Sequence, residues 1–274
     1  DVYKRQRKEV RDYIVESVGK TLDGAKISYV KWDMNRHMSD AYSPCLSNQG
    51  EFAHRYIIGL YEVLDRVFTP RRHILFESCS SGGNRFDLGM LCYSPQIWAS
   101  DDTDPIERLD IQSGLSYLYP QSTVGAHVSA APHQQTLRDT PLSTRFNVAA
   151  FGVLGYELEL KYMTHAELKE LRGQIEFYKA HRKTFQFGRF YRFDERKDNK
   201  VHWQVSSRDG KEHIVGHFQK LCTASEGPDA LCVHDLDSKA KYHLSCKRQS
   251  LFIKRLGGLV KHVMPIELGP DGLI

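Results

Sequence analysis

Three short segments of this sequence combine acidic, basic and glycine residues in a way that could support proton-transfer chemistry. The first is KWDMNR at residues 31–36, in which Lys31 and Asp33 lie two residues apart. The second is CSSGG at residues 79–83, whose adjacent glycines would let backbone amides approach a ligand closely. The third is WASDDTD at residues 98–104, with three carboxylates in four residues. Together they offer the carboxylates, the amine and the backbone donors that acid-base chemistry on a polar substrate needs.

The acids of the first and third segments could act as a pair. Asp33 and one of the acids at residues 101–104 follow separate apolar runs, so they would come from two different structural supports. Cleavage of a glycosidic bond requires two such carboxyl groups, one attacking or stabilising carbon and one exchanging a proton with the leaving oxygen. Trp32 and Trp98 would suit the apolar face of a sugar. The residues alone therefore favour carbohydrate chemistry.

Each of the three segments also has a purely structural interpretation. Lys31 and Asp33 could be an ion pair satisfied at the end of a strand. The glycines could form a plain turn between a strand and a helix. Thr103 or Asp104 could cap the helix that follows. Capping does not account for all three acids of the third segment.

The chain that must position these residues alternates between two apolar periodicities. Helices are predicted at about residues 7–22, 52–68, 104–117, 142–151 and 164–178, and strands at residues 27–32, 73–78, 95–100, 122–127 and 156–160. This alternation predicts right-handed βαβ units and a parallel sheet. Polar residues such as Asp33, Cys79, Asp101 and His127 stand at the strand ends. A (β/α)₈ barrel, in which those ends converge on one site, is favoured over an open sheet.

After about residue 185 the periodicity changes to two. Val201, Trp203 and Val205 alternate with polar residues, and RDGK at residues 208–211 predicts a turn. We therefore predict an α/β fold in which residues 1–183 form a partial TIM (β/α)₈ barrel. Residues 184–274 are predicted to form an antiparallel, β-sandwich-like C-terminal domain.

Composition excludes several other classes of protein. The 274 residues are 41% hydrophobic and 26% charged, with a net charge of +4 that is too weak to indicate nucleic-acid binding. Nowhere do the roughly 18 consecutive apolar residues of a membrane helix occur, and the charged N-terminal residues do not form a signal peptide. The six cysteines include no CxxC pair. We expect no nucleic-acid or membrane partner, and a reducing cytoplasm as the location.

A metal site at the histidines is the other possibility that the residues raise. His127 and His133 lie six residues apart, with no third ligand at a typical spacing. We therefore predict neither a metal ion nor a cofactor.

Five motifs, in this order and spacing, resemble the family 36 glycoside hydrolases, α-galactosidases that act on melibiose, raffinose and stachyose. They are KWDMNR, ESCSSGGNRFD, PQIWASDDTDPIERL, GAHVSAAPHQQT and FGVLGYELEL. The resemblance covers roughly residues 25–165 and, more loosely, the β region that follows. It implies a retaining mechanism in which Asp33 is the nucleophile and Asp101 is the general acid/base.

The resemblance also implies a substrate pocket. The expected substrate-binding residues are Lys31, Trp32, Asn35, Arg36, Cys79, Gly82, Gly83, Trp98 and Asp104. Among them, Asn35 and Arg36 are expected to support the nucleophile's loop. The expected substrate is an α-galactoside oligosaccharide, and the full-length protein is expected to be a homo-oligomer.

The sequence departs from the family at its start, because it begins just before the strand that bears Asp33. Compared with the family, we expect the first three barrel units, which hold the paired acids for the galactose O4 and O6 hydroxyls, to be missing. Residues 1–183 would then cover about strands 4–8 and residues 184–274 a truncated C-terminal β domain, so that the isolated fragment could be inactive. Three alternatives stay open: an α-galactosyl transglycosylase, an α-N-acetylgalactosaminidase on the same scaffold, and a non-catalytic carbohydrate-binding fragment. The last would not need two opposed acids on separate strand ends.

Overall fold

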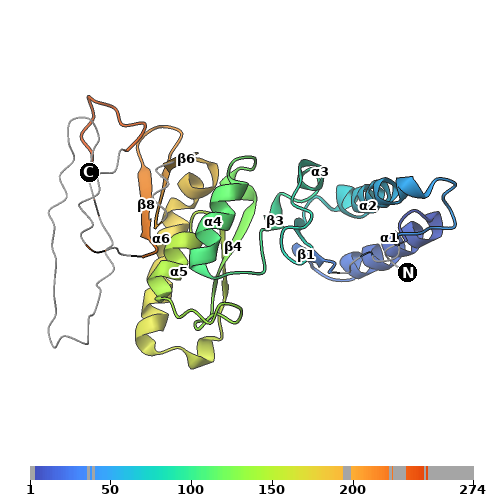
Figure 1. The fold of residues 1–274 in the computed structure, drawn as a ribbon, viewed down its shortest axis with the longest axis horizontal. Helices are drawn as coiled ribbons and strands as arrows, with labels where there is room; N and C mark the ends of the chain where they lie inside the picture. The colour runs from blue at the N-terminus through green and yellow to red at the C-terminus, as the bar shows by residue number, and fades with distance from the viewer. Residues whose placement is uncertain are drawn as a thin grey trace. The chain divides into compact units, whose positions relative to one another are not determined.

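The computed structural model describes residues 4–35, 38, 41–193, 199–221, 224, 233–243 and 245. The chain divides into two compact units (Figure 1). The first comprises residues 1–102 with 122–125, and the second comprises residues 103–121 with 126–274. The domain boundary at residue 183 stays a prediction.

The first unit alternates helices with parallel strands, as predicted. Its elements are α1 (Lys8–Asp23), β1 (Tyr29–Asp33), η1 (Gln49–Glu51), α2 (Phe52–Phe68), η2 (Thr69–Arg71), β2 (Leu75–Cys79), α3 (Leu88–Leu91) and β3 (Gln96–Trp98). Strands β1, β2 and β3 pair in parallel, in that order. Their carboxyl ends therefore lie at the same edge of the sheet.

The core of the first unit forms between the helices and one face of this sheet. Helix α2 buries a stripe of apolar residues at helical spacing, namely Leu60, Val63, Leu64 and Val67. The stripe packs with Ile14 of α1 and Phe76 of β2 in one hydrophobic cluster. Figure 1 shows α1 and α2 lying alongside each other. This packing leaves the other face of β1 for polar side chains.

The second unit begins at the loop after β3. Its elements are α4 (Pro105–Leu115), η3 (Gln121–Thr123), β4 (Val124–Ser129), α5 (Leu142–Ala149), β5 (Val153–Glu157), η4 (Leu160–Tyr162), α6 (His165–Phe187), β6 (Arg189–Phe193), β7 (Lys200–Ser206) and β8 (His213–Gln219). The first residues of β4 belong to the first unit and pair in parallel with β3. The five-stranded sheet has the order β1-β2-β3-β4-β5. The predicted α/β fold with a partial parallel barrel sheet is thereby confirmed.

The fifth strand is found about three residues earlier than predicted, at Val153–Glu157 instead of residues 156–160. Gly155 lies at its centre, and a Cβ atom at this position would stand 2.4 Å from the imidazole ring of His127 on β4. The ring occupies the space that a side chain would need. Glycine in this strand therefore marks a close approach, because no other residue fits there.

Helix α6 begins at a capping box and ends nine residues later than predicted. The Thr164 hydroxyl accepts a hydrogen bond from the Glu167 amide at 3.2 Å, and the Glu167 carboxylate accepts one from the Thr164 amide at 2.8 Å. The helix continues to Phe187, and its buried Tyr178 and Phe185 join the core of the second unit.

The predicted hairpin is present as β7 and β8, in a three-stranded antiparallel sheet with β6. Trp203 and Val205 point into the core of the second unit, where the Trp203 ring contacts that of Phe151 at 5.3 Å. Gln204 points to the opposite face and is also buried. Its side-chain amide forms hydrogen bonds with the backbone N–H and C=O of His234, both at 2.8 Å. In the part of the chain that is described, a non-strand segment thus covers this face, and the sandwich stays a prediction.

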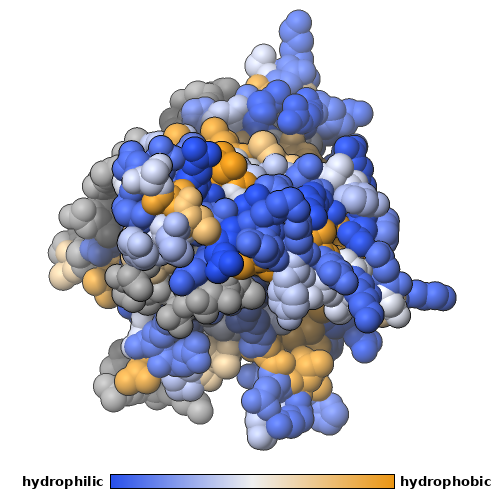
Figure 2. All heavy atoms as spheres, turned by 90° about the vertical axis from the view of Figure 1, so that its right-hand side faces the viewer, coloured by the Kyte–Doolittle hydropathy of each residue, from blue (hydrophilic) through white to orange (hydrophobic). Residues whose placement is uncertain are grey.

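The face drawn in Figure 2 is largely hydrophilic, with hydrophobic residues in small scattered groups. Within the described ranges, none of the helices has the length and apolar character needed to cross a membrane.

The packing of α2 leads to a test of the core. Leu64 is fully buried on the inner face of α2, so Leu64→Ala is expected to lower the free energy of unfolding by about 2–5 kcal/mol. Ile58, on the same helix, is 48% exposed, and Ile58→Ala should cost less than about 1 kcal/mol. Urea denaturation followed by circular dichroism measures both. Equal losses at the two positions would show that this face of α2 is not the packed one.

Candidate active site

Asp33 is the last residue of β1, and its carboxylate is surrounded by groups that can donate hydrogen bonds. Alternation along β1 places Tyr29, Lys31 and Asp33 on one face of the sheet. The Asn35 amide donates to Asp33 Oδ2 at 3.0 Å, and the Cys79 thiol donates to the same carboxylate. Arg36, the other predicted support of this loop, lies outside the described residues.

Trp32 points the other way, and its predicted role in sugar binding needs correction. Its ring packs edge-on against Phe68 at 6.0 Å and Phe76 at 6.2 Å between ring centroids. Because neighbouring residues on a strand face opposite sides, Trp32 cannot share the face of Lys31 and Asp33. The structure gives Trp32 a packing role beside the core of the first unit.

The glycine-rich loop after β2 contacts the segments of both acids. The Ser81 amide donates to the Asn35 side-chain oxygen at 2.6 Å, on the Asp33 side. Gly82 has a φ of 79°, and a Cβ atom there would lie 2.8 Å from Ser100 Cα and 3.0 Å from the Asp101 nitrogen. Only glycine satisfies both the left-handed conformation and the close approach. The double glycine is therefore a turn that brings two loops together.

Gly83 has no room for a side chain either, because the backbone of Ala99 lies against it. A Cβ atom on Gly83 would lie 2.6 Å from the carbonyl oxygen of Ala99. On the side of β2, the Arg85 guanidinium donates to the carbonyl of Cys79 at 2.7 Å. These contacts fix the loop between its two supports.

Asp101 follows β3, and its carboxylate accepts a hydrogen bond from the indole of Trp98. Trp98 is 3% exposed, and its Nε1 donates to Asp101 Oδ1 at 2.9 Å. Apart from this contact, Asp101 is exposed. Asp101 therefore meets solvent directly.

Lys31 has a different partner from the one its spacing suggested. Its ammonium lies 3.6 Å from Glu77 Oε1 and 4.5 Å from the centroid of the Trp98 ring. Lys31 and Glu77 are register partners on β1 and β2, and Asp33 and Cys79 are the next such pair. Sequence analysis missed Glu77. Glu77 could have been identified from the sequence, because it stands two residues before Cys79 and so lies on the same face of the strand.

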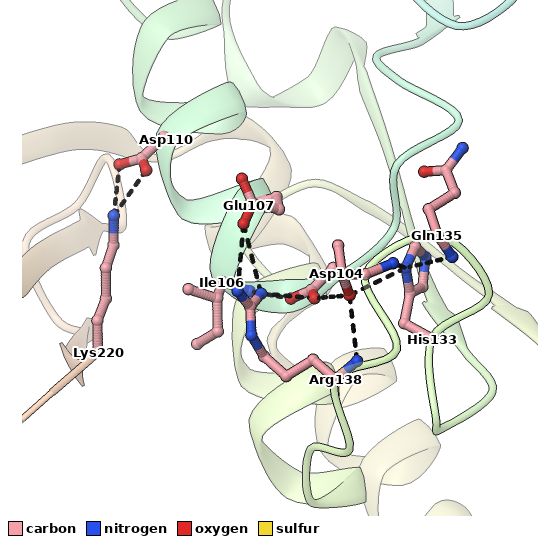
Figure 3. A network of polar contacts seen from close by, with 9 residues as sticks. Asp104, Ile106, Glu107, Asp110, His133, Gln135, Arg138 and Lys220 are labelled. Atoms are coloured by element: carbon pink, nitrogen blue, oxygen red, sulfur yellow. Dashed lines mark hydrogen bonds and ion pairs between the residues drawn. The ribbon is translucent and has the colours of Figure 1, made fainter.

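Asp104 has the capping role that the sequence offered as an alternative (Figure 3). It is fully buried, its Oδ1 accepts from the Ile106 amide at 2.8 Å, and its Oδ2 accepts from Thr136 and from Arg138, the latter at 2.5 Å. Burial alone would raise the pKa of Asp104, but the hydrogen bonds from Thr136 and Arg138 hold it below its ordinary value. Both oxygens are engaged within the second unit, so this geometry does not favour contact with a substrate.

The Cys79 thiol is held in its neutral form. Burial raises its pKa to about 11, and the adjoining Asp33 carboxylate adds to the rise because it repels a thiolate. At neutral pH the thiol is therefore a hydrogen-bond donor to Asp33 and a poor nucleophile.

The histidines that could suggest a metal have other partners. His127 Nδ1 lies 2.6 Å from Glu157 Oε1, and His133 Nε2 lies 3.0 Å from the Thr103 hydroxyl. No group of three or more His, Cys, Asp or Glu side chains is placed to hold a metal ion in the residues that the structure describes.

The arrangement at this edge can perform general acid-base and nucleophilic chemistry. Asp33 and Asp101 stand at the carboxyl ends of parallel strands in one sheet, and the loop of residues 79–83 contacts the segments of both. Lys31 lies on the same face of β1 as Asp33, and its ammonium is a hydrogen-bond donor.

Comparison with known proteins points to one family. The profile of the family described as Melibiase matches residues 1–188. Alpha-galactosidase AgaA of Geobacillus stearothermophilus is 46% identical over 241 residues, which are 87% of this chain and 33% of the relative. Alpha-galactosidase 1 of Pediococcus pentosaceus is 50% identical over 239 residues, which are 86% of this chain and 33% of the relative. The chain thus spans about a third of the length of these curated relatives.

Solved structures agree with the sequence comparison. The crystal structure of the GH36 alpha-galactosidase AgaA from Geobacillus stearothermophilus matches with a TM-score of 0.82 and 46% identity, over 86% of this chain and 33% of that chain. A variant of AgaA in complex with raffinose matches over the same shares with a TM-score of 0.82 and 45% identity. With the profile covering more than half of its residues, the chain belongs to the Melibiase family.

Proposed function

We propose that the protein is a retaining α-galactosidase that hydrolyses terminal α-galactosyl residues of melibiose- and raffinose-type oligosaccharides. The observation that carries the proposal is the placement of Asp33 and Asp101 at one sheet edge, with a glycine loop in contact with both segments. Family membership supports it, as do the structures of AgaA variants in complex with raffinose and with stachyose.

In this proposal Asp33 attacks the anomeric carbon. The Asn35 amide and the Cys79 thiol both donate to its carboxylate, which fixes the direction of that group. Attack forms a glycosyl ester at Asp33 and breaks the bond to the leaving oxygen. Lys31, the loop at Gly82 and Gly83, and Arg36 would bind the hydroxyls of the sugar.

Asp101 supplies the proton in the first step and removes one from water in the second. Trp98 orients one of its oxygens, and the exposed side chain can exchange protons with solvent. A double displacement of this kind requires the two carboxyl groups to be about 5–5.5 Å apart. Transfer to a second sugar would use the same pair of acids, and so would an α-N-acetylgalactosaminidase.

The wider setting of the site belongs to the same proposal. We propose that residues 1–183 are part of a (β/α)₈ barrel and that residues from 184 onward belong to a β-sandwich-like domain. The full-length protein would be a homo-oligomer of the bacterial cytoplasm.

The two acids should respond differently to removal. In the full-length gene product that includes this chain, Asp33→Ala should abolish turnover, and azide should restore it with a galactosyl azide of inverted configuration. Asp101→Ala should slow cleavage of natural oligosaccharides by about 10²–10⁴-fold. Aryl galactosides with good leaving groups should lose far less, and azide should give the retained product.

Nuclear magnetic resonance of the azide products measures the configuration. Asp102→Ala, which removes the neighbouring acid, serves as the control and should keep the wild-type product. Exchanged configurations would reverse the assignment of nucleophile and acid/base. Full activity of Asp33→Ala without azide would remove Asp33 from the mechanism.

A second prediction concerns Gly82. Gly82→Val should raise KM and lower kcat/KM, because the new side chain would collide with Ser100 and displace the backbone of Asp101. Gly210 is the matched control, since it has a φ of 70° but no atom within 4 Å of an added Cβ. Gly210→Val should cost stability of about 1–3 kcal/mol through its backbone alone and leave KM unchanged. Unchanged kinetics for Gly82→Val would contradict this placement of the loop.

A third prediction follows from the raised pKa of Cys79. Iodoacetamide should modify the exposed Cys45 and Cys92 near pH 8 while Cys79 stays intact, and modification of Cys79 should increase only as the pH approaches about 11. Asp33→Asn should make Cys79 react at lower pH, because the repelling carboxylate is gone. Mass spectrometry of peptides gives the rates. Rapid alkylation of Cys79 at pH 8 would show that the thiol is neither buried nor neutral.

A further inference from the structure

The buried carboxylate of Glu77, which the proposed mechanism does not use, lies beside the ammonium group of Lys31. Glu77 on β2 is 2% exposed, and it is the register partner of Lys31 on β1. Its Oε2 accepts a hydrogen bond from the Tyr29 hydroxyl, and its Oε1 lies 3.6 Å from Lys31 Nζ. Burying a carboxylate is unfavourable unless such partners compensate for lost water. Tyr29 and Lys31 supply that compensation from one face of β1.

Lys31 is held from two sides at its tip. The Glu77 carboxylate attracts the Lys31 ammonium. The centroid of the Trp98 ring lies 4.5 Å from Lys31 Nζ, with the ammonium over the face of the ring. A lysine side chain has many rotamers, and these two contacts select one of them. The side chain keeps 35% of its surface exposed, and an ammonium has three donors. Donors thus remain available for a ligand hydroxyl.

The same tryptophan connects Lys31 to the proposed acid/base. Trp98 contacts the Lys31 ammonium through its ring face and donates to Asp101 Oδ1 through Nε1 at 2.9 Å. Glu77, Lys31, Trp98 and Asp101 therefore form a continuous series of contacts within the first unit. Glu77 is its buried end and Asp101 is its exposed end.

We propose that Glu77 is a positioning residue that fixes the Lys31 ammonium on the face of Trp98 for recognition of substrate hydroxyls. This proposal rests on the proposed function, since it assigns Lys31 to the sugar pocket. Glu77 itself is too deeply buried to touch a substrate, so it acts through Lys31. The competing explanation is an ion pair that only stabilises the sheet.

The first test observes Lys31 without any substrate. In protein labelled with ¹³C at lysine Cε, the Trp98 ring should shift the Lys31 ε-protons upfield of those of exposed lysines, and Lys31→Arg identifies the signal. Glu77→Gln should move this signal most of the way to the exposed position. Glu77→Asp, which keeps the charge but withdraws it by one methylene, should move it less, and it carries the test should Glu77→Gln fail to fold.

The matched control is Ser94→Ala. Ser94 is a buried polar residue next to the same strand, and its hydroxyl contacts the backbone of Phe76 and Ser78. Its loss should lower the melting temperature and leave the Lys31 signal in place. The proposal would be overturned if the chemical shift of the Lys31 ε-protons were unchanged in both Glu77 variants.

The second test is kinetic and uses the full-length gene product that includes this chain. Glu77→Gln should raise KM for an aryl α-galactoside about tenfold or more, the range typical of a lost charged contact, and change kcat much less. In a Lys31→Met background the same substitution should have no further effect on KM. An undiminished effect in that background would mean that Glu77 acts independently of Lys31.

The two tests separate the proposals. If the protein cleaves no galactoside, the proposed function fails while the resonance of Lys31 still decides whether Glu77 positions the lysine. If the protein cleaves galactosides and the Lys31 signal does not depend on Glu77, the positioning role fails alone.

Discussion

The parallel register of β1, β2 and β3 is the constraint on which the site depends. It sets Lys31 opposite Glu77 and Asp33 opposite Cys79, so each functional side chain has its partner at the same height in the neighbouring strand. A slip of one residue would turn Asp33 toward the helices and bring Trp32 to the polar face. The apolar face of the sheet, which packs against α1 and α2, prevents that slip.

Electrostatic pairing then decides which acids remain available. Glu77 is occupied by Tyr29 and Lys31, and Asp104 is occupied by its cap and by Arg138. Asp33 receives neutral donors, and Asp101 receives one indole N–H and otherwise meets solvent. A carboxylate that is already paired has little to offer a substrate. Of these four acids, Asp33 and Asp101 are the two to which the proposed mechanism assigns chemistry.

The glycine loop shows how backbone shape serves the site. Gly82 and Gly83 stand where a side chain would strike the backbone of Ala99 and Ser100, so the loop can approach the Asp101 segment. Ser81 in the same loop bonds to Asn35, which in turn bonds to Asp33. The distance between the two acid-bearing segments is thereby set by a loop that carries no acid of its own.

The sequence by itself determined the alternation of helices and strands, the antiparallel hairpin, the capping box at Thr164 and the presence of Asp33 and Asp101 after separate strands, because apolar periodicity and capping are local properties. Local patterns could not choose between the two roles of Asp104, nor find the partner of Lys31 or the start of β5. Those depended on atoms distant in the chain: Arg138 for Asp104, Glu77 for Lys31 and the ring of His127 for Gly155. Charge pairing and steric fit act through space, so only the tertiary structure decided them.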